Sequence, residues 1–348
     1  MSPIRTAIAG FGISAKVFHA PFIHTMPEFE LVSVQERNRE DSKLIYPDVQ
    51  VVKTFEELIS DPSIELVVVT TPNDTHFLYA AAAMRAGKHV VLEKPFANST
   101  RDAQELIDIS KETGTLLSVY QNRRYVSDFL TIKEILGKKL LGDVHEFVAH
   151  YDRYRAEARP NAWREKPEPG SGILYDLGSH LIDQALQLFG MPNSITADIK
   201  QQRPHAKTDD FFEIWMQYDK LKVRLHSGML VREMGPRYMV HGTVGSFIKS
   251  GEDPQEAALR AGEMPVGHRW GYEDPLDEGI LHTIIDGAVE RRSYPTLPGN
   301  FGSYYKNIWR AIRQHAPLTE TAMDGYRTIF IIEKAFESWR EGRTITLY

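Results

Sequence analysis

Short apolar runs alternate with helical stretches along the first third of the chain. The runs rich in Val, Ile and Leu are expected to form strands at Pro3–Ala9, Glu30–Val34, Leu66–Thr70, His89–Leu92 and Leu116–Val119. Continuous apolar runs of this kind are typical of strands that are covered on both faces, as in a parallel sheet.

Helices are expected between these strands. One is predicted over Thr75–Ala86 and another over Arg101–Thr113, and a glycine follows each as a termination signal. Ser99 or Thr100 would cap the start of the second helix. Repeated strand–helix–strand units with short connections predict a doubly wound α/β domain with right-handed crossovers.

The pattern changes after about residue 122. Phe211–Tyr218 and Lys222–Leu230 alternate apolar and polar side chains, and the Asp219-Lys220 step lies between them as a turn. Strict alternation predicts an antiparallel sheet with one buried face and one polar face.

These patterns divide the chain into two predicted domains, as its length of 348 residues also favours. Residues 1–122 form the α/β domain, and residues 123–348 form an α+β domain with a large, mainly antiparallel open sheet. Ala322–Arg340 is a predicted helix that could pack back on the first domain. Residues 251–300, rich in glycine, proline and acidic residues, are expected to form irregular connections.

Composition excludes several classes of function. The net charge of -6 gives no reason to expect nucleic acid or an anionic membrane as a partner. The chain has no cysteine, which excludes disulfides, thiolate metal sites and a cysteine nucleophile. No apolar run reaches the roughly 18 residues of a membrane span. Met1–Arg5 lacks a signal-peptide pattern, and we expect a cytoplasmic protein.

A glycine-rich turn follows the first predicted strand. Residues 10–15, GFGISA, fit the pattern G-x-G-x-x-A, which between a strand and a helix predicts a dinucleotide site. Gly10 would make the tight turn, and Gly12 would let the backbone approach the pyrophosphate. Ile13 and Ser14 would enter the helix whose N-terminus faces the phosphates.

The end of the second predicted strand bears on the choice of cofactor. Glu36 lies where an acid would bind the ribose hydroxyls, which favours NAD. Arg37 beside it could instead pair with a 2′-phosphate, which favours NADP. Together they favour NAD and leave NADP open.

The Glu93-Lys94-Pro95 step follows a buried strand, so it falls at the sheet edge where α/β proteins bind ligands. Lys94 could orient a substrate hydroxyl there and lower a neighbouring pKa. The proline permits a cis bond. Taken alone, such a step is more often a simple turn.

Residues 170–183, GSGILYDLGSHLID, hold a second concentration of reactive groups. In a helix, Asp176, His180 and Asp183 would share one face. Histidine titrates near neutral pH and could exchange a hydroxyl proton, although His180 could equally be a core histidine. We expect no metal here, because no third ligand accompanies His180 and Asp183 at a recognisable spacing.

The order of four motifs resembles the glucose-fructose oxidoreductase/inositol dehydrogenase (Gfo/Idh/MocA) family. The motifs are GFGISA, TPNDTH at Thr71–His76, EKP at Glu93–Pro95 and the segment at Gly170–Asp183. The resemblance covers nearly the whole chain and is greatest to the branch with NADP-dependent scyllo-inositol dehydrogenases. NADP enzymes of that branch have a small residue where this chain has Glu36, so NADP preference does not carry over.

The resemblance implies roles for individual residues. Lys94 matches the catalytic lysine, His180 the acid/base and Asp176 its partner. The implied cofactor contacts, beyond the glycine loop, are Glu36, Arg37, Thr71, Pro72, Asn73, His76, Glu93, Lys94 and Gln121. The implied substrate-facing residues are Asn122, Arg123, Arg124, Tyr154, Trp163 and Arg164; surface salt bridges are the alternative for the arginines, and packing for Trp163.

The resulting hypothesis is an NAD(P)-dependent oxidoreductase that moves a hydride between nicotinamide and a secondary alcohol or ketone of a polyol or sugar. The main alternative is a cofactor-binding sensor without net turnover. Two others are an enzyme that uses a tightly bound cofactor only transiently and a purely structural protein. We expect a homodimer or homotetramer formed through the C-terminal sheet, as in relatives.

Overall fold

The computed structural model describes residues 2–158 and 165–347, and the chain forms two compact units. The first unit comprises Met1–Asn122, Gln255–Trp270 and Asn300–Ile329. The second unit comprises Arg123–Pro254, Gly271–Gly299 and Phe330–Tyr348. Each unit thus draws on segments that are far apart in the sequence.

The first unit is built on a six-stranded parallel sheet of order β3-β2-β1-β4-β5-β6. Its strands are β1 (Ile4–Ala9), β2 (Phe29–Gln35), β3 (Gln50–Val52), β4 (Leu66–Val69), β5 (His89–Leu92) and β6 (Leu117–Val119). This is the strand order of dinucleotide-binding Rossmann domains, and it confirms the predicted doubly wound domain. Strand β3, which has only three residues and is not fully buried, was not predicted.

Helices connect these strands, as the sequence predicted. The connecting helices are α1 (Ala20–Thr25), α2 (Asp41–Ile45), α3 (Phe55–Ser60), α4 (His76–Arg85) and α5 (Thr100–Thr113). Two helices from later in the chain, α8 (Gln255–Arg260) and α9 (Gly302–Gln314), belong to the same unit. The side chain of Ser99 caps α5 by accepting a hydrogen bond from the Asp102 amide. Gly114 ends the helix in the left-handed conformation, with φ of 66°.

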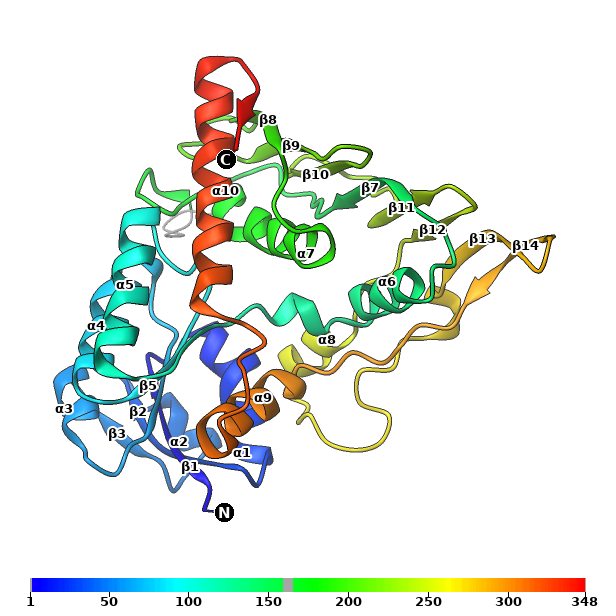
Figure 1. Ribbon diagram of the computed structural model, residues 1–348. Helices are drawn as coiled ribbons and strands as arrows, with labels where there is room; N and C mark the ends of the chain where they lie inside the picture. The colour runs from blue at the N-terminus through cyan, green and yellow to red at the C-terminus, as the bar shows by residue number, and fades with distance from the viewer. Residues whose placement is uncertain (1, 159–164, 348) are drawn as a thin grey trace. The chain divides into compact units, whose positions relative to one another are not determined.

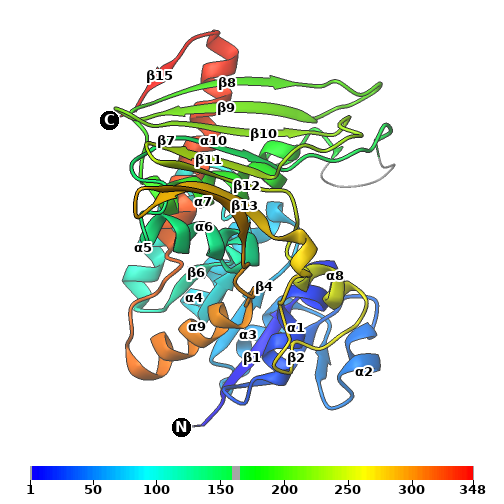
Figure 2. The same ribbon diagram turned by 90° about the vertical axis from the view of Figure 1, so that its right-hand side faces the viewer.

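The second unit contains a nine-stranded sheet, whose long strands lie side by side in Figure 2. Its order is β14-β13-β12-β11-β7-β10-β9-β8-β15. The strands are β7 (Val144–His150), β8 (Ser194–Lys200), β9 (Phe211–Gln217), β10 (Lys222–Gly228), β11 (Tyr238–Gly242), β12 (Gly245–Lys249), β13 (Gly279–Ile285), β14 (Ala288–Tyr294) and β15 (Ile345–Thr346). Among the described strands of this second sheet only the β7–β10 pair is parallel, which confirms a mainly antiparallel sheet.

The expectation that residues 251–300 are irregular is wrong for part of this region. This region contains α8 and the β13–β14 hairpin. The hairpin was missed because β14 is almost entirely exposed and carries the charged run Glu290-Arg291-Arg292, so its apolar alternation is weak.

Helices cover one face of the nine-stranded sheet. Helices α6 (Ser127–Gly137) and α7 (Ser179–Phe189) lie on the same side of it (Figure 1). Phe147 of β7 packs edge-on against Phe189 of α7, with ring centroids 5.4 Å apart. Phe212 of β9 is also fully buried on this face. The later part of α10 (Ala322–Glu341) belongs to this unit as well.

The opposite face of strands β9 and β10 carries Glu213, Trp215, Arg224 and His226, as the predicted alternation requires. None of the helices that the structure describes is both long and apolar enough to cross a membrane.

Replacing Phe212 with Ala should destabilise the second unit by about 3–5 kcal/mol, because a fully buried ring leaves a cavity that the sheet cannot close. Urea unfolding measures the change. Gln217→Ala, on the exposed end of the same strand, is the control and should stay within about 0.5 kcal/mol of the unmodified protein. Equal effects from the two substitutions would contradict the assigned faces.

Candidate dinucleotide and catalytic residues

The glycine loop has the geometry that a dinucleotide needs. Gly10 has φ of 87°, and a Cβ there would lie 3.2 Å from Cγ2 of Thr71. A Cβ on Gly12 would meet nothing within 4 Å, so space lies beside this backbone. Thr70 closes the turn, because its hydroxyl donates to the carbonyls of Ala9 and Gly10 at 3.0 Å.

The loop lies at the point where the strand order reverses. Strands β1 and β4 are neighbours in the sheet, and the connections that follow them run in opposite directions. Residues 10–15 and 70–73 therefore start from adjacent carboxyl ends, which is where open α/β sheets bind their ligands.

The carboxylate of Glu93 is the centre of a buried hydrogen-bond network beneath this loop. Its Oε1 accepts from the Ser14 hydroxyl and from Nε2 of His19, the latter at 2.9 Å. Its Oε2 accepts from the Lys94 amide at 2.9 Å. The other ring nitrogen of His19 lies 2.6 Å from the Tyr305 hydroxyl. Glu93 thus links the glycine loop, the Lys94 loop and helix α9.

This network keeps Glu93 ionised although it is only 8% exposed. Burial alone would raise its pKa, but the hydrogen bonds from His19 and Ser14 outweigh burial and lower the pKa to about 2. Glu93 therefore has a structural task in this chain, and its side chain is already occupied by protein donors.

The buried side chain of His76 holds the Thr71–His76 loop in place. His76 is 2% exposed, and its ring nitrogens lie 2.9 Å from the Pro95 carbonyl and 3.0 Å from the Thr71 carbonyl. His76 thus shapes the loop and turns its ring away from solvent. Asn73 is buried and donates to Asn98 at 3.2 Å, whereas Pro72 is exposed. The Lys94–Pro95 bond is cis, as the sequence permits.

Gln121, at the end of β6, has a buried side-chain oxygen without a hydrogen-bond partner among the described residues. Buried polar atoms normally find partners. An amide donor on a ligand would satisfy this oxygen. Together with the open space beside Gly12, this orphaned acceptor shows that the residues present fit a dinucleotide with a carboxamide group.

The carboxylate of Glu36 accepts hydrogen bonds from the start of α2, which the sequence did not indicate. Its carboxylate accepts from the amides of Asp41 and Ser42, at 3.0 and 2.9 Å, and from the Ser42 hydroxyl. It is only 7% exposed, because it satisfies the first amides of α2. Arg37 is exposed, and in the described parts of the chain it forms no ion pair.

Asp176 and His180 lie one turn apart on a continuous helical segment of the second unit. A single π-helical turn, Leu174–Gly178, contains Asp176 and leads into α7, which contains His180. Such turns are frequent at functional sites. Gly178 lets this turn approach the sheet, since a Cβ there would lie 3.3 Å from the Phe212 ring. His180 is 6% exposed, and Asp176 is partly exposed.

A buried carboxylate positions the start of this segment. Asp209 accepts a hydrogen bond from the Leu174 amide at 2.8 Å. Gly172, with φ of 89°, makes room for it, because a Cβ there would lie 1.9 Å from Oδ1 of Asp209. Sequence reasoning missed Asp209, as it missed His19 and Tyr305, since each acts on a segment remote in the chain. The adjacent acids Asp209-Asp210 before a strand were the only signal.

Two of the arginines predicted to face substrate, Arg123 and Arg124, are buried. Arg124 forms a bidentate ion pair with Asp183, at 2.7 and 2.6 Å, and both side chains are 3% exposed. Asp183 therefore holds a buried arginine. Arg123 is also buried, with its guanidinium 5.8 Å from the Tyr151 ring centroid. The alternative of surface salt bridges is thus wrong for Arg123 and Arg124.

The remaining predicted substrate residues lie in different surroundings. Asn122 is buried at the start of a 3-10 turn. Tyr154 is 44% exposed, and the Arg232 guanidinium lies 3.9 Å from its ring centroid. Trp163 and Arg164 lie outside the described residues.

The strand order and the glycine loop define a dinucleotide-binding protein. Residues 4–121 match the description "Oxidoreductase family, NAD-binding Rossmann fold", and residues 133–347 match "Oxidoreductase family, C-terminal alpha/beta domain". The chain belongs to the Gfo/Idh/MocA family of oxidoreductases.

Individual relatives match the chain over its full length. It is 43% identical to scyllo-inositol 2-dehydrogenase (NADP(+)) IolW of Bacillus subtilis, over 99% of this chain and 96% of the relative. The solved yvaA structure from Bacillus subtilis has a TM-score of 0.97 and 43% identity, with 100% of this chain and 99% of the other covered. A solved Bacteroides fragilis structure has a TM-score of 0.92 and 46% identity, with 99% and 100% covered.

Glu93→Gln should destabilise the first unit at neutral pH and not at low pH. The folded-state pKa of Glu93 lies below its ordinary value of 4.5, so its charge stabilises the fold above pH 4.5, and this stabilisation is lost as pH falls toward 2. We expect a deficit on the order of 3 kcal/mol at pH 7 that shrinks steadily below pH 5.

Chemical denaturation across this pH range measures the deficit. Glu105→Gln on the exposed surface of α5 is the matched control, and its small effect should not vary in the same way. A Glu93→Gln deficit that is independent of pH would contradict the ionised carboxylate.

Proposed function

We propose that this protein is an NAD(P)-dependent dehydrogenase that interconverts a secondary alcohol and the corresponding ketone on a polyol or sugar of the inositol type. One observation carries the proposal. A chain 43% identical to a scyllo-inositol 2-dehydrogenase retains Lys94, Asp176 and His180, the three residues that the family resemblance assigns to catalysis.

His180 exchanges the hydroxyl proton in this proposal. Its imidazole can accept a proton during oxidation and return it during reduction, since histidine titrates near neutral pH. Asp176, one helical turn earlier, orients the ring and stabilises its charged form. The buried start of α7 favours this role, because a side chain on a packed helix keeps its position better than one on a loop.

Lys94 stabilises the negative charge that develops on the same oxygen. A fixed ammonium group is preorganised for that charge and needs no rearrangement during the reaction. The backbone of Lys94 is held by Glu93, so its direction is set by the buried network. A bound nicotinamide would accept or supply the hydride, and Gly10, Gly12 and Gln121 are the residues suited to hold it.

NADP is the cofactor that the loop after β2 favours. The argument for NAD rested on a Glu36 carboxylate available to ribose hydroxyls, and that carboxylate is already bound by Asp41 and Ser42. Arg37 beside it is exposed and suited to a 2′-phosphate. The relative IolW carries NADP(+) in its name, which supports the same choice.

The proposal extends to assembly through the nine-stranded sheet. The face opposite α7 carries Ile248 and Ile284, which are 37% and 50% exposed. Apolar side chains on a broad sheet face suit a two-fold contact with a second copy of the chain.

A panel of inositols, aldoses and sugar acids, assayed for reduced-nicotinamide absorbance with NADP and NAD separately, tests the proposed activity. We expect turnover of at least one polyol. His180→Ala should lower its kcat by about 10²–10⁴-fold and leave the Kd for NADPH unchanged, since it removes only proton transfer.

His145→Ala, an exposed histidine of the same unit, is the control and should retain full activity. Unchanged turnover in His180→Ala would remove this residue from the mechanism. Tight NADPH binding without turnover of any polyol would instead identify a sensor.

Arg37→Ala should raise the Kd for NADPH about 10–100-fold and leave that for NADH unchanged, because a charge-assisted bond contributes about 1.5–3 kcal/mol. Fluorescence titration measures both constants. Arg85→Ala is the control, since this exposed arginine ends α4 at the opposite edge of the sheet. Equal losses for both cofactors would refute phosphate recognition by Arg37.

A further inference from the structure

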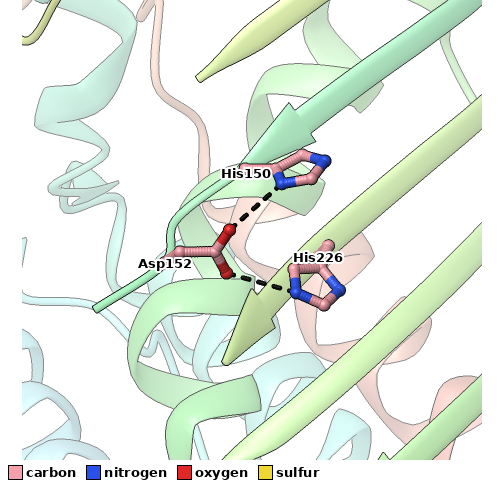
Figure 3. Close-up of side chains that lie close together, drawn as sticks. All are labelled: His150, Asp152 and His226. Carbon is pink, nitrogen blue, oxygen red and sulfur yellow. Dashed lines mark hydrogen bonds and ion pairs between the residues drawn. The ribbon is translucent and has the colours of Figure 1, made fainter. Parts of the chain in front are cut away.

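Three potential metal ligands meet on the face of the nine-stranded sheet that lies opposite α7. His150 is the last residue of β7, Asp152 follows two residues later, and His226 lies in the neighbouring strand β10 (Figure 3). The two histidines are directly paired in the parallel β7–β10 register, so their side chains project from the same face. This placement is independent of the dinucleotide and catalytic residues.

The distances within this trio suit a single cation. Oδ2 of Asp152 lies 3.1 Å from Nδ1 of His150, and Oδ1 lies 3.2 Å from Nε2 of His226. The three ligand atoms all lie within 4.8 Å of one another. Two ligands that bind a tetrahedral metal at 2.0–2.1 Å are about 3.3 Å apart, so little movement is needed to seat an ion.

The trio is held in place by its surroundings. The side chains of His150, Asp152 and His226 are 20%, 6% and 16% exposed. Asp152 also accepts from the Gly228 amide at 3.0 Å, which fixes the carboxylate between the two strands. The Phe211 ring packs edge-on against His226, with centroids 5.1 Å apart.

A second carboxylate, that of Glu213, lies near the ring of His226 on the side away from Asp152. Oε2 of Glu213 lies 3.6 Å from Nδ1 of His226, the ring nitrogen that faces away from Asp152. A carboxylate on the far nitrogen is the usual support of a metal-binding histidine, because it fixes the tautomer and strengthens the ligand. Asp152 and Glu213 together also offset the two charges of a divalent cation.

A cation on the same face of β10 lies near an aromatic ring. Arg224 precedes His226 by two residues, and its guanidinium lies 5.6 Å from the Trp215 ring centroid. His226 itself carries the only imidazole among the described residues of β10. The trio thus offers two imidazole nitrogens and one carboxylate as its donor set.

We propose that His150, Asp152 and His226 bind one divalent transition-metal ion, for which Zn²⁺ is the best suited, with water completing the coordination. Two imidazole nitrogens and one carboxylate favour Zn²⁺ over Mg²⁺ or Ca²⁺, which prefer oxygen ligands. The ion joins the ends of β7 and β10 and stabilises the second unit. The expectation of no metal considered only His180 and Asp183, whereas this trio brings together strands far apart in the sequence.

Calorimetric titration of the chelator-treated, untagged full-length protein with Zn²⁺ tests the proposal. We expect one site per chain that Mg²⁺ does not compete for. Asp152→Asn and His226→Gln should each weaken this site at least 100-fold, and Glu213→Gln should weaken it about 10–100-fold. His282→Gln, an exposed histidine on β13 of the same sheet, is the matched control and should leave the site intact.

Thermal unfolding gives a second measurement that does not depend on redox activity. Zn²⁺ should raise the Tm of the unmodified protein and of His282→Gln, because a ligand that binds only the folded state stabilises it. It should not raise the Tm of His226→Gln, in which Asp152 keeps its bond to Gly228. Co²⁺ in the same site should give visible absorption that His226→Gln lacks.

The proposal is overturned if the unmodified protein has no Zn²⁺ site that both Asp152→Asn and His226→Gln remove. It is equally overturned if Zn²⁺ raises the Tm of His226→Gln as much as that of the unmodified protein. In either case the three side chains form only a hydrogen-bonded polar cluster.

Discussion

The carboxylate of Glu93 is the interaction on which the dinucleotide end of the first unit depends. A buried charge without partners would cost several kcal/mol, so the surrounding chain must supply donors. Ser14 in the glycine loop, His19 in the helical segment after it and the Lys94 amide supply them. The cofactor loop and the proposed catalytic lysine therefore share one support, and neither can shift without disturbing the other.

The second unit holds its candidate catalytic segment by the same physical means. The π-helical turn and α7 carry Asp176 and His180, and Asp209 binds the first amide of this segment from β9's N-terminal side. Further along α7, Asp183 is locked to Arg124. Buried charges are costly when unpaired, so these pairs fix the register of the helix more strictly than apolar packing alone. His180 lies between the two anchors.

Local signals predicted the parallel sheet, the glycine loop and helix α5, because each depends on residues close together in the sequence. Ser99 and Gly114 bound α5 as expected. The features that could not be predicted depend on distant partners. Nothing beside Glu36 in the sequence indicates that it binds the start of α2. The pairing of His150 with His226 likewise follows from the parallel β7–β10 contact, which no local pattern encodes.

Because successive side chains of a strand point to opposite faces, the proposed metal site and the candidate catalytic segment lie on opposite sides of the sheet in the second unit. On β10, Leu225 is buried toward the helices, whereas His226 projects from the opposite face. The backbone of the strand therefore separates a metal bound by His226 from the side of the sheet that α7 covers. Its more direct effect is along the chain, because the segment after Asp152 pairs with the segment after β10 through the Tyr154–Leu230 bridge. Tyr154 is a candidate substrate residue, so joining β7 to β10 at Asp152 would restrict its motion without adding a chemical group to the reaction.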